Sequence, residues 1–474
     1  MIQVRVLGAA GGVTGSAYLV ETSQAKVLVD LGLFQGRDAR TTNGHGEKID
    51  VNQSLGVIDP RALSAVVLTH AHLDHTGRLP MLTRAGYNGP IFATPASGDL
   101  TEAVLRDSAG IQEQDTQREN RKRERAGLDP IEPIYTKQDA EAVYKLIKDV
   151  PYAKEAPVAP GVKIRYYEAG HILGSASIAM TVSDNATTKK IVFSGDIGPR
   201  NAPILRDPEP PGEADLIFLE STYGDKEHPG SDASIDQLVR IVRDTIFNKQ
   251  RVIIPAFAIG RTQLLLYHLI CAHEAGELAD IPVYLDSPAA KRATEVYMKH
   301  TNLYDAEAGK LARCQRLVDG LKTLRLIETP AESRALNESW DPCVIIAGSG
   351  MCEGGRIVHH LRHNLWRRGT AVVLVGYMAE GTLGRKLADG AEQVYIFNDP
   401  IAVRADIHRL DGFSAHAGRA ELIAWPEKMM RGRPRIALTH GEDGPRAALA
   451  AGLKDRYGVN AERPMRGDVI QLAD

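Results

Sequence analysis

The sequence has few cysteines, no long apolar run and no excess of basic residues, and each shortage excludes a class of protein. Its four cysteines form no CxxC pair, which argues against a disulfide framework and against a thiolate zinc site: Cys271, Cys314, Cys343 and Cys352. No apolar run is long enough to span a membrane, and Met1 leads directly into a strand-like pattern instead of a signal peptide. These features predict a cytoplasmic protein.

The charge balance excludes a protein that is basic overall. The chain has 57 lysines and arginines against 60 acidic residues, for a formal net charge of −3. Any surface for a polyanion therefore has to be local. The apolar fraction of 43% and charged fraction of 25% are ordinary for a globular protein. A length of 474 residues predicts more than one domain, or one domain with a large insertion.

One short stretch concentrates side chains that bind metals. The apolar run from Ala65 to Thr69 predicts a buried strand, and His70, His72, Asp74 and His75 follow it directly. Residues two apart in an extended segment share a face, so His70 and His72 can converge on one point. Asp74 and His75 follow where the chain must turn. Imidazoles and a carboxylate without a thiol suit Zn²⁺, and would also accept iron or manganese. The alternative, a polar strand end that caps a helix, does not explain four such residues.

Other strands also end at residues that can bind metals or transfer protons. Predicted strands end at Asp30, His171, Asp196 and Glu220 in the first half of the chain, and at His416 and His440 near its end. A single such residue is more often structural, and Asp30 alone is as readily explained as a turn cap. Together they indicate a site, because α/β proteins build sites from the loops at strand ends.

The middle of the chain has a different pattern. From about residue 226, helical stretches (234–248, 262–275 and 289–300) alternate with buried strands (251–255, 282–285, 343–347 and 371–375). This alternation predicts a largely parallel sheet with both faces covered. The last segment returns to the style of the first. We therefore expect a metal domain formed by residues 1–224 and 405–474, with a second α/β domain, residues 225–404, inserted into it.

Three glycine loops in the insertion each open a helix and each supply an arginine. Amide groups at helix starts favour anions, so the loops indicate a surface for a phosphate backbone. A dinucleotide-binding motif is excluded because the third glycine of residues 348–355 is misplaced. Plain packing is the alternative, and we expect it for His360. The candidate phosphate contacts are Arg261, Ser349, Arg356, His359 and Arg385.

The chemistry of the side chains suggests a two-metal assignment. His70, His72 and His171 would hold one ion, while Asp74, His75 and His440 would hold the other. Asp196 would bridge the two ions, and Asp30 would orient a ligand histidine through its ring N–H. Two metals about 3.5–4 Å apart can share and activate a hydroxide at neutral pH, which suits displacement at phosphorus.

Glu220 and His416 remain outside this ligand set. Cleavage of a phosphodiester requires a proton on the leaving alkoxide, and a histidine held by a carboxylate supplies one near neutral pH. We interpret His416 as the general acid and Glu220 as its partner. Together with Asp74 and Asp196 they form the predicted catalytic set. The alternative is two surface loop residues, because residues of these types mark sites only probabilistically.

These residues resemble a known family. His70-Ala-His-Leu-Asp-His75, followed by His171 and Asp196, resembles the metallo-β-lactamase superfamily. Glu220 in Glu-Ser-Thr-Tyr-Gly-Asp, His416 in Phe-Ser-Ala-His-Ala and His440 in Thr-His-Gly-Glu are similar to motifs A, B and C of its β-CASP branch. The resemblance implies an αββα sandwich with an inserted β-CASP α/β domain, and two zinc ions per chain.

The resemblance also implies a function. Branch members are nucleases, and those similar in organisation include the endonuclease subunit of the cleavage and polyadenylation factor and its stand-alone prokaryotic relatives. A histidine in motif B implies single-stranded RNA as the substrate, with endonuclease action favoured over 5′-exonuclease action. No KH-type module precedes Met1 and no long domain follows Asp474, so we expect a minimal version.

Two other functions were weighed against this one. A hydrolase of small esters or thioesters should lack motifs A to C and the insertion, whereas a non-catalytic scaffold of an RNA-processing complex should have lost ligands. Neither expectation fits this sequence. We expect no membrane partner, and the sequence leaves a homodimer open.

Overall fold

The chain folds into two compact units. The computed structural model describes residues 1–42, 48–227, 231–305, 323–376 and 378–472. The first unit comprises Met1–Ala202, Arg206–Glu227 and His416–Asp474, and the second comprises Pro203–Leu205 and His228–Ala415. The second unit is therefore an insertion in the sequence of the first, as the change of pattern near residue 226 suggested.

The first unit is built on two mixed β-sheets. The strands of the first sheet, in spatial order, are β23 (Val469–Leu472), β1 (Ile2–Val6), β2 (Tyr18–Glu21), β3 (Lys26–Val29), β6 (Ala65–Val67), β7 (Ile91–Ala93) and β8 (Ile147–Asp149). Those of the second are β22 (Arg435–Thr439), β13 (Leu216–Glu220), β12 (Thr187–Phe193), β11 (Ala176–Asp184), β10 (Val162–Glu168) and β9 (Glu155–Ala159). In both sheets, parallel pairs bring several strand ends to the same edge.

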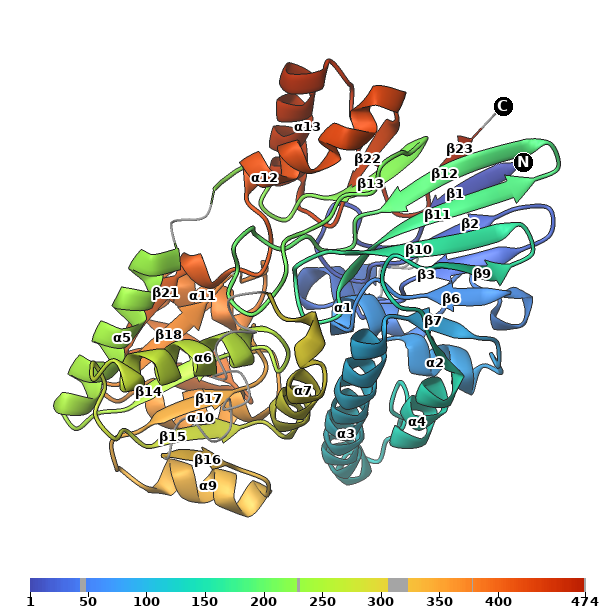
Figure 1. Cartoon of the computed structure of the whole chain (residues 1–474). Helices are drawn as coiled ribbons and strands as arrows, with labels where there is room; N and C mark the ends of the chain where they lie inside the picture. Colours follow the sequence, from blue (N-terminus) through green and yellow to red (C-terminus); the bar gives the residue numbers. More distant parts are fainter. Residues whose placement is uncertain (43–47, 228–230, 306–322, 377, 473–474) are drawn as a thin grey trace. The chain divides into compact units, whose positions relative to one another are not determined.

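Two layers of helices cover the outer faces of these sheets (Figure 1). Residues from both sheets, such as Val27, Ile178 and Phe218, share one buried cluster, so the sheets pack face to face. A second cluster joins the first sheet to α2 (Leu79–Arg84), α3 (Pro95–Arg125) and α4 (Lys137–Leu146). A third joins the second sheet to α12 (Arg419–Ala424) and α13 (Asp443–Tyr457). The unit is thus an αββα sandwich, which confirms the predicted fold class.

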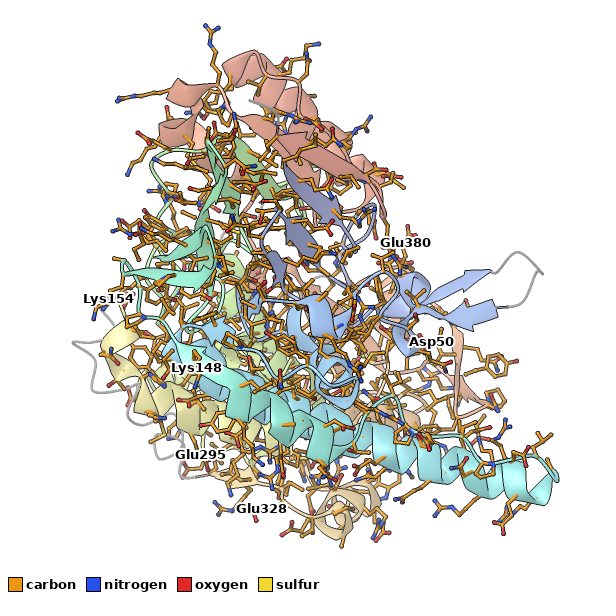
Figure 2. The ribbon with its side chains drawn as sticks, turned by 90° about the vertical axis from the view of Figure 1, so that its right-hand side faces the viewer. Asp50, Lys148, Lys154, Glu295, Glu328 and Glu380 are labelled. Atoms are coloured by element: carbon orange, nitrogen blue, oxygen red, sulfur yellow. The ribbon has the colours of Figure 1, made fainter. Side chains whose placement is uncertain are left out.

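The charged stretch after residue 101 belongs to the 31-residue helix α3. Its first half is buried against the sandwich, and its second half, seen in Figure 2 extending outward in cyan, is mostly exposed. Ion pairs three residues apart, such as Asp115 with Arg118, stabilise that exposed half. None of the described helices, α3 included, is long and apolar enough to cross a membrane.

The second unit has one six-stranded parallel sheet. Its strands, in spatial order, are β16 (Leu324–Leu326), β15 (Val283–Asp286), β17 (Val344–Ala347), β14 (Val252–Pro255), β18 (Ala371–Val375) and β21 (Asp406–Leu410). Its helices are α5 (Ser231–Phe247), α6 (Arg261–Glu274), α7 (Pro288–Lys299), α9 (Pro330–Glu338), α10 (Arg356–Asn364) and α11 (Leu383–Ala388). The central strands are buried along their whole length, which explains their continuous apolar sequence.

Strand β21 differs from its expected place. The sequence placed it in the returning metal domain, because apolar residues alternate along residues 404–410. In the structure it pairs in parallel with β18, with Ala371 opposite Asp406. It is the last strand of the sheet, so one edge has no strand neighbour and its side chains are only partly covered. The sequence pattern of an edge strand in a parallel sheet can therefore resemble that of a strand in an antiparallel sheet.

Small elements complete the described chain. Two hairpins are formed by β4 (Arg40–Thr42) with β5 (Lys48–Asp50), and by β19 (Gln393–Ile396) with β20 (Asp399–Ala402). The one-turn helix α1 (Leu73–Thr76) follows β6, and the 3₁₀ helices are η1 (Gly36–Ala39), η2 (Val51–Gln53), η3 (Pro60–Ala62), η4 (Thr301–Leu303), η6 (Asp411–Phe413) and η7 (Trp425–Gly432). Cys271, Cys343 and Cys352 are free thiols, while Cys314 lies outside the described residues.

Candidate active site

The predicted metal ligands meet at one edge of the sandwich. All of them lie in the first unit, at or just after the ends of β6, β10, β12 and β22. Helix α1 carries Asp74 and His75, and its first turn begins at His72. Gly32 allows this close fold, because a Cβ atom there would lie 1.5 Å from the carbonyl oxygen of Asp74. Gly195, with φ of 57°, lets the chain turn immediately before Asp196.

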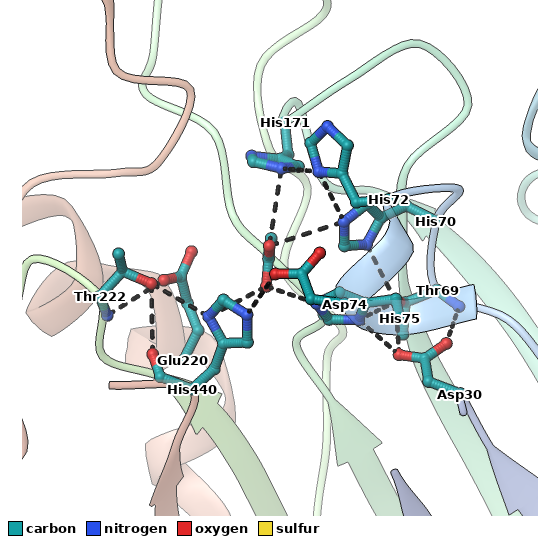
Figure 3. A network of polar contacts seen from close by, with 12 residues as sticks. Asp30, Thr69, His70, His72, Asp74, His75, His171, Glu220, Thr222 and His440 are labelled. Carbon is teal, nitrogen blue, oxygen red and sulfur yellow. Dashed lines mark hydrogen bonds and ion pairs between the residues drawn. The ribbon is translucent and has the colours of Figure 1, made fainter. Parts of the chain in front are cut away.

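Four side chains form the first group of candidate ligands. His70, His72, His171 and Asp196 each offer one atom, and these atoms lie within 4.8 Å of one another. His72 Nδ1 is 3.2 Å from His70 Nε2 and 3.0 Å from His171 Nε2 (Figure 3). The residues are at least partly buried, with His70 fully so. Three imidazole nitrogens and a carboxylate at this spacing are a donor set that suits zinc.

Three side chains form the second group, which is the set expected from the sequence. Asp74, His75 and His440 bring one ligand atom each to within 4.8 Å of the others. Asp74 Oδ2 lies 3.6 Å from His440 Nε2. Asp196 faces both groups with different oxygens. Its Oδ2 lies 3.6 Å from the Nε2 atoms of His70 and His171, and its Oδ1 lies 3.3 Å from His75 Nε2. This is the arrangement that a bridging carboxylate requires.

The buried polar atoms at this point fit a bound cation. His75 Nε2, His440 Nε2 and Asp196 Oδ1 have no hydrogen-bond partner among the described residues, although all three are buried. Buried polar atoms without hydrogen bonds are costly, and native proteins usually satisfy them. A cation between them would satisfy all three at once. The donor set, nitrogen and oxygen without sulfur, therefore fits zinc on the structure alone.

Asp30 and Thr69 orient two of the candidate ligand histidines. Asp30 Oδ2 lies 2.7 Å from His75 Nδ1 and accepts a hydrogen bond of 2.8 Å from the Thr69 hydroxyl. The Thr69 hydroxyl oxygen is in turn 3.1 Å from His70 Nδ1. These contacts place a proton on Nδ1 of both histidines, which leaves Nε2 as the ligand atom. Asp30 thus has the position that the sequence predicted for it.

Burial and neighbouring charges set the protonation of the cluster. Burial lowers the pKa of His72 to about 4 and that of His70 well below its usual value, so both imidazoles are neutral at pH 7 and can bind metal. Burial also lowers the pKa of His75, but the carboxylates of Asp196 and Asp30 outweigh it and raise that pKa well above normal. Burial raises the pKa of Asp196, yet His440, His75 and His70 hold it well below the usual range.

Glu220 and His416 form a pair beside the first group. Glu220 Oε1 lies 3.2 Å from His416 Nδ1 and also accepts a 2.7 Å hydrogen bond from the Ile197 amide. The His416 ring centroid is 4.5 Å from that of His171. Burial lowers the pKa of His416, but Glu220, Asp196 and Asp74 together raise it above its usual value. The imidazolium form is therefore more favoured than in a free imidazole, which suits a general acid.

Two hydroxyl residues at the site could not be found from the sequence. Besides Thr69, Thr222 lies in the cluster, with its hydroxyl 3.1 Å from His440 Nδ1. This contact directs His440 Nε2 toward Asp74. Thr69 ends an apolar run and Thr222 lies in a turn, and threonine is common in both contexts. Their adjacency to a predicted ligand or motif residue was the only available signal.

The five candidate phosphate contacts lie in the second unit. Arg356 donates hydrogen bonds to Asp286 and to the carbonyls of Ile327 and Glu328. Ser349 Oγ accepts from two amides of its own loop, and Arg385 Nε donates to Asp389 at 2.9 Å. These contacts favour structural roles, so phosphate binding by these three stays a prediction.

The other two candidates differ in exposure. Arg261 is buried, and a Cβ atom on Gly376 would lie 2.8 Å from its Nη2 atom, so the guanidinium packs on that glycine. His359 is exposed and packs on Phe397, with ring centroids 4.9 Å apart. His360, which we expected to pack, is fully buried between Asn337 and Asp286. Of the five candidates, only His359 is well exposed to solvent.

Comparison with known families agrees with this architecture. The metallo-β-lactamase superfamily model matches residues 10–256, which is more than half of the chain. The chain belongs to the metallo-β-lactamase superfamily. Within this superfamily it carries the features of the β-CASP branch: a Beta-Casp domain matches residues 262–387, and a Zn-dependent metallo-hydrolase RNA specificity domain matches residues 400–464. The predicted family is thereby confirmed.

Individual members of the superfamily are similar over nearly the whole chain. A ribonuclease of Thermus thermophilus is 35% identical over 93% of this chain and 94% of its own length. The transcription termination factor FttA of Thermococcus kodakarensis is 29% identical over 99% of this chain and 71% of its own length. A crystal structure of a protein of unknown function from Enterococcus faecalis shares the fold, with a TM-score of 0.50, 15% identity and coverage of 99% of this chain and 100% of that one.

Proposed function

We propose that this metallo-β-lactamase superfamily member is a zinc-dependent ribonuclease that hydrolyses single-stranded RNA at a two-zinc site. The observation that carries the proposal is the position of Asp196, which turns one carboxylate oxygen toward each of two groups of candidate ligands. The match to an RNA specificity domain and the similarity to a ribonuclease support RNA as the substrate. Zinc bound there would supply an activated water for attack on phosphorus and neutralise charge on the phosphate oxygens.

The protein itself would hold the ligands in register. His70, His72 and His171 would hold one zinc, and Asp74, His75 and His440 the other. Asp30 would keep the His75 ring oriented through the 2.7 Å contact with Nδ1. Because these side chains lie at strand ends or on the short helix α1 and are mostly buried, little reorganisation would be needed for the ions to bind.

His416 would supply the proton that the leaving oxygen needs. Glu220 holds its Nδ1 side, so the proton for transfer is at Nε2. Glu220 is itself fixed by the amides of Ile197 and Thr222. A carboxylate anchored in this way keeps the imidazole in one orientation and stabilises its charged form. This pair would raise the rate of cleavage by a factor of about 10²–10⁴, as is typical for general acid catalysis.

Internal cleavage is the mode that we propose, in line with the resemblance of motifs A to C to endonucleases. The test uses a closed circular single-stranded RNA and a linear RNA of the same sequence, each incubated with zinc-loaded protein. We expect the circle to be opened, and Asp196→Ala to leave both substrates intact. Degradation of the linear RNA alone would show an exonuclease. Intact RNA in every reaction with metal-loaded protein would overturn the ribonuclease proposal.

A further inference from the structure

The second unit exposes two tryptophans side by side. Trp340 is 65% exposed and Trp366 is 45% exposed, and their ring centroids are 6.3 Å apart in an edge-to-face arrangement. The chain has only three tryptophans, and the third, Trp425, is buried in the first unit. Large aromatic side chains on a surface mark interaction sites when they are clustered. This pair therefore requires an explanation.

An arginine lies on both rings. The Arg367 guanidinium carbon is 3.9 Å from the centroid of Trp340 and 5.4 Å from that of Trp366. It covers one side of the Trp340 ring, while most of that side chain remains exposed to solvent. An arginine stacked on tryptophan extends the flat surface on which a further ring can stack. We call Trp340, Trp366 and Arg367 the tryptophan platform.

The platform is held in place by buried polar contacts. Arg251 is only 3% exposed, and it donates hydrogen bonds to the carbonyls of Leu336 and Asp341, on either side of Trp340. Trp366 lies in the turn just after α10, where the Leu365 carbonyl accepts from two backbone amides. The loops that carry the tryptophans are thus fixed by the fold, so the exposed rings lose little freedom when a ligand binds.

Basic residues gather on the Trp366 side of the platform. From Arg356 to Met378 the sequence contains four arginines and three histidines, and no acidic residue. Arg368 and His363 are exposed next to the platform in the sequence. On the other side, the exposed acidic residues Glu338 and Asp341 flank Trp340 in the sequence, and Asp399 pairs with Arg362. Exposed aromatic rings bordered by Arg367 and Arg368 suit a polyanion that has flat rings.

The same helix extends this surface. His359 lies in α10, one turn before His363, and packs on the half-exposed ring of Phe397. Positions 359 and 363 are four apart in this helix and share one of its faces. His359 and His363 therefore extend the surface of the platform along α10.

We propose that the tryptophan platform is an accessory binding site for single-stranded RNA. Bases stack on Trp340 and Trp366, while Arg368 and His363 contact the phosphates. Stacking on aromatic side chains tolerates any base sequence, and basic neighbours supply the salt-dependent part of the affinity. The inference rests on the proposed function only for the identity of the polymer. The site would hold long substrates without taking part in the chemistry.

The test compares RNA binding by variants of the full chain. In an Asp196→Ala background, which prevents consumption of the RNA, the Trp340→Ala, Trp366→Ala double variant should bind a 20-nucleotide RNA at least fivefold more weakly. The Trp340→Phe variant should retain binding because phenylalanine also stacks. Phe247→Ala is the matched control: Phe247 is 85% exposed in the same unit, at the end of α5, and should not matter. Thermal unfolding checks that each variant is folded.

Two further measurements distinguish this site from the catalytic one. RNA should quench the tryptophan fluorescence of the parent protein but not that of the double variant. Heparin, a polyanion without bases, should quench the fluorescence of neither protein. In the active protein, the double variant should raise the KM for long RNA at unchanged kcat. Unchanged RNA affinity and KM in the double variant would overturn the proposal and assign the surface to another partner, such as a protein. Equal losses in the Phe247 control would also overturn it. Failure of the parent to cleave RNA would affect only the proposed function.

Discussion

His416 Nδ1 lies 3.2 Å from Glu220 Oε1, although 196 residues separate them in the chain. The main segment of the second unit, His228–Ala415, is encoded between these two residues. Their side chains nevertheless meet within the first unit, next to the histidines of the candidate metal site. The pair therefore depends on the correct return of the chain at residue 416, and its role can be tested separately from that of the metals.

Loss of the imidazole should slow the chemical step without loss of metal. We expect His416→Ala to lower kcat by about 10²–10⁴ with zinc content unchanged, because the leaving oxygen then departs without a proton. An RNA with sulfur in place of the leaving oxygen needs no proton, so the variant should cleave it nearly as fast as the parent does. Single-turnover rates on both substrates measure this. Equal losses on both would contradict a general-acid role.

Removal of candidate ligands should change the zinc content in steps. We expect two zinc ions per chain in the parent, one in His440→Ala, and fewer than one in Asp196→Ala, because the latter carboxylate faces both groups. Elemental analysis of dialysed protein measures the content. Lys163→Ala, at an exposed ion pair on β10, serves as a control and should retain two. Two ions retained by Asp196→Ala would contradict the bridging role.

Asp30 should affect metal affinity more than it affects folding. It touches no candidate metal position but holds His75 Nδ1 at 2.7 Å and the Thr69 hydroxyl at 2.8 Å. Loss of such an orienting partner typically costs 10–100-fold in metal affinity, so we expect a shift of about that size for Asp30→Asn in a competition with a zinc chelator. Thr69→Val should give a smaller shift. A loss of zinc affinity that is no greater for Asp30→Asn than for Thr69→Val would contradict this assignment.

Glu168 should make stability depend on pH. Burial raises its pKa to about 7, against hydrogen bonds from the Gly170 amide and Tyr152 that lower it. The folded state therefore holds this proton more tightly than the unfolded state, whose pKa is near 4.5. Stability should fall as pH rises from about 4.5 through about 7. Glu168→Gln removes this term, so the variant should melt at a higher temperature than the parent at pH 8, with the difference shrinking at pH 5. A constant difference would contradict the shifted pKa.

Arg356 should stabilise the second unit. Asp286 is fully buried and accepts hydrogen bonds from Arg356, His360 and Ser333. Loss of one partner of a buried ion pair costs about 3–5 kcal/mol, and partial exposure of Arg356 reduces the expected cost for Arg356→Ala to about 2–3 kcal/mol. Denaturant unfolding measures it. Unchanged stability together with a higher KM for RNA would instead support the phosphate contact expected from the sequence.

The structure brings the predicted ligands together because each of them lies just after a strand. His70 to His75, His171, Asp196 and His440 all follow apolar runs that β-structure explains, and parallel strands bring their ends together. The confirmed fold class rests on the same patterns. Family resemblance then grouped residues that are hundreds of positions apart, which no local pattern can do.

What the sequence could not predict depends on contacts between distant elements. Strand β21 joins the second sheet through its pairing with β18, and the pattern of an edge strand does not specify its partner. The ion pair between Arg356 and Asp286, which lie 70 residues apart, could not be predicted either. Thr69 and Thr222 act through a single hydroxyl each, a group too common to stand out.

The most direct test of the account couples metal content to RNA cleavage. Metal-free protein is titrated with zinc, and the initial rate of cleavage of a labelled single-stranded RNA is measured at each ratio. If two ions act together across Asp196, the rate should rise to a plateau at two zinc ions per chain, with Asp196→Ala inactive at every ratio. A full rate at one ion per chain, or no cleavage at two, would contradict the two-metal ribonuclease.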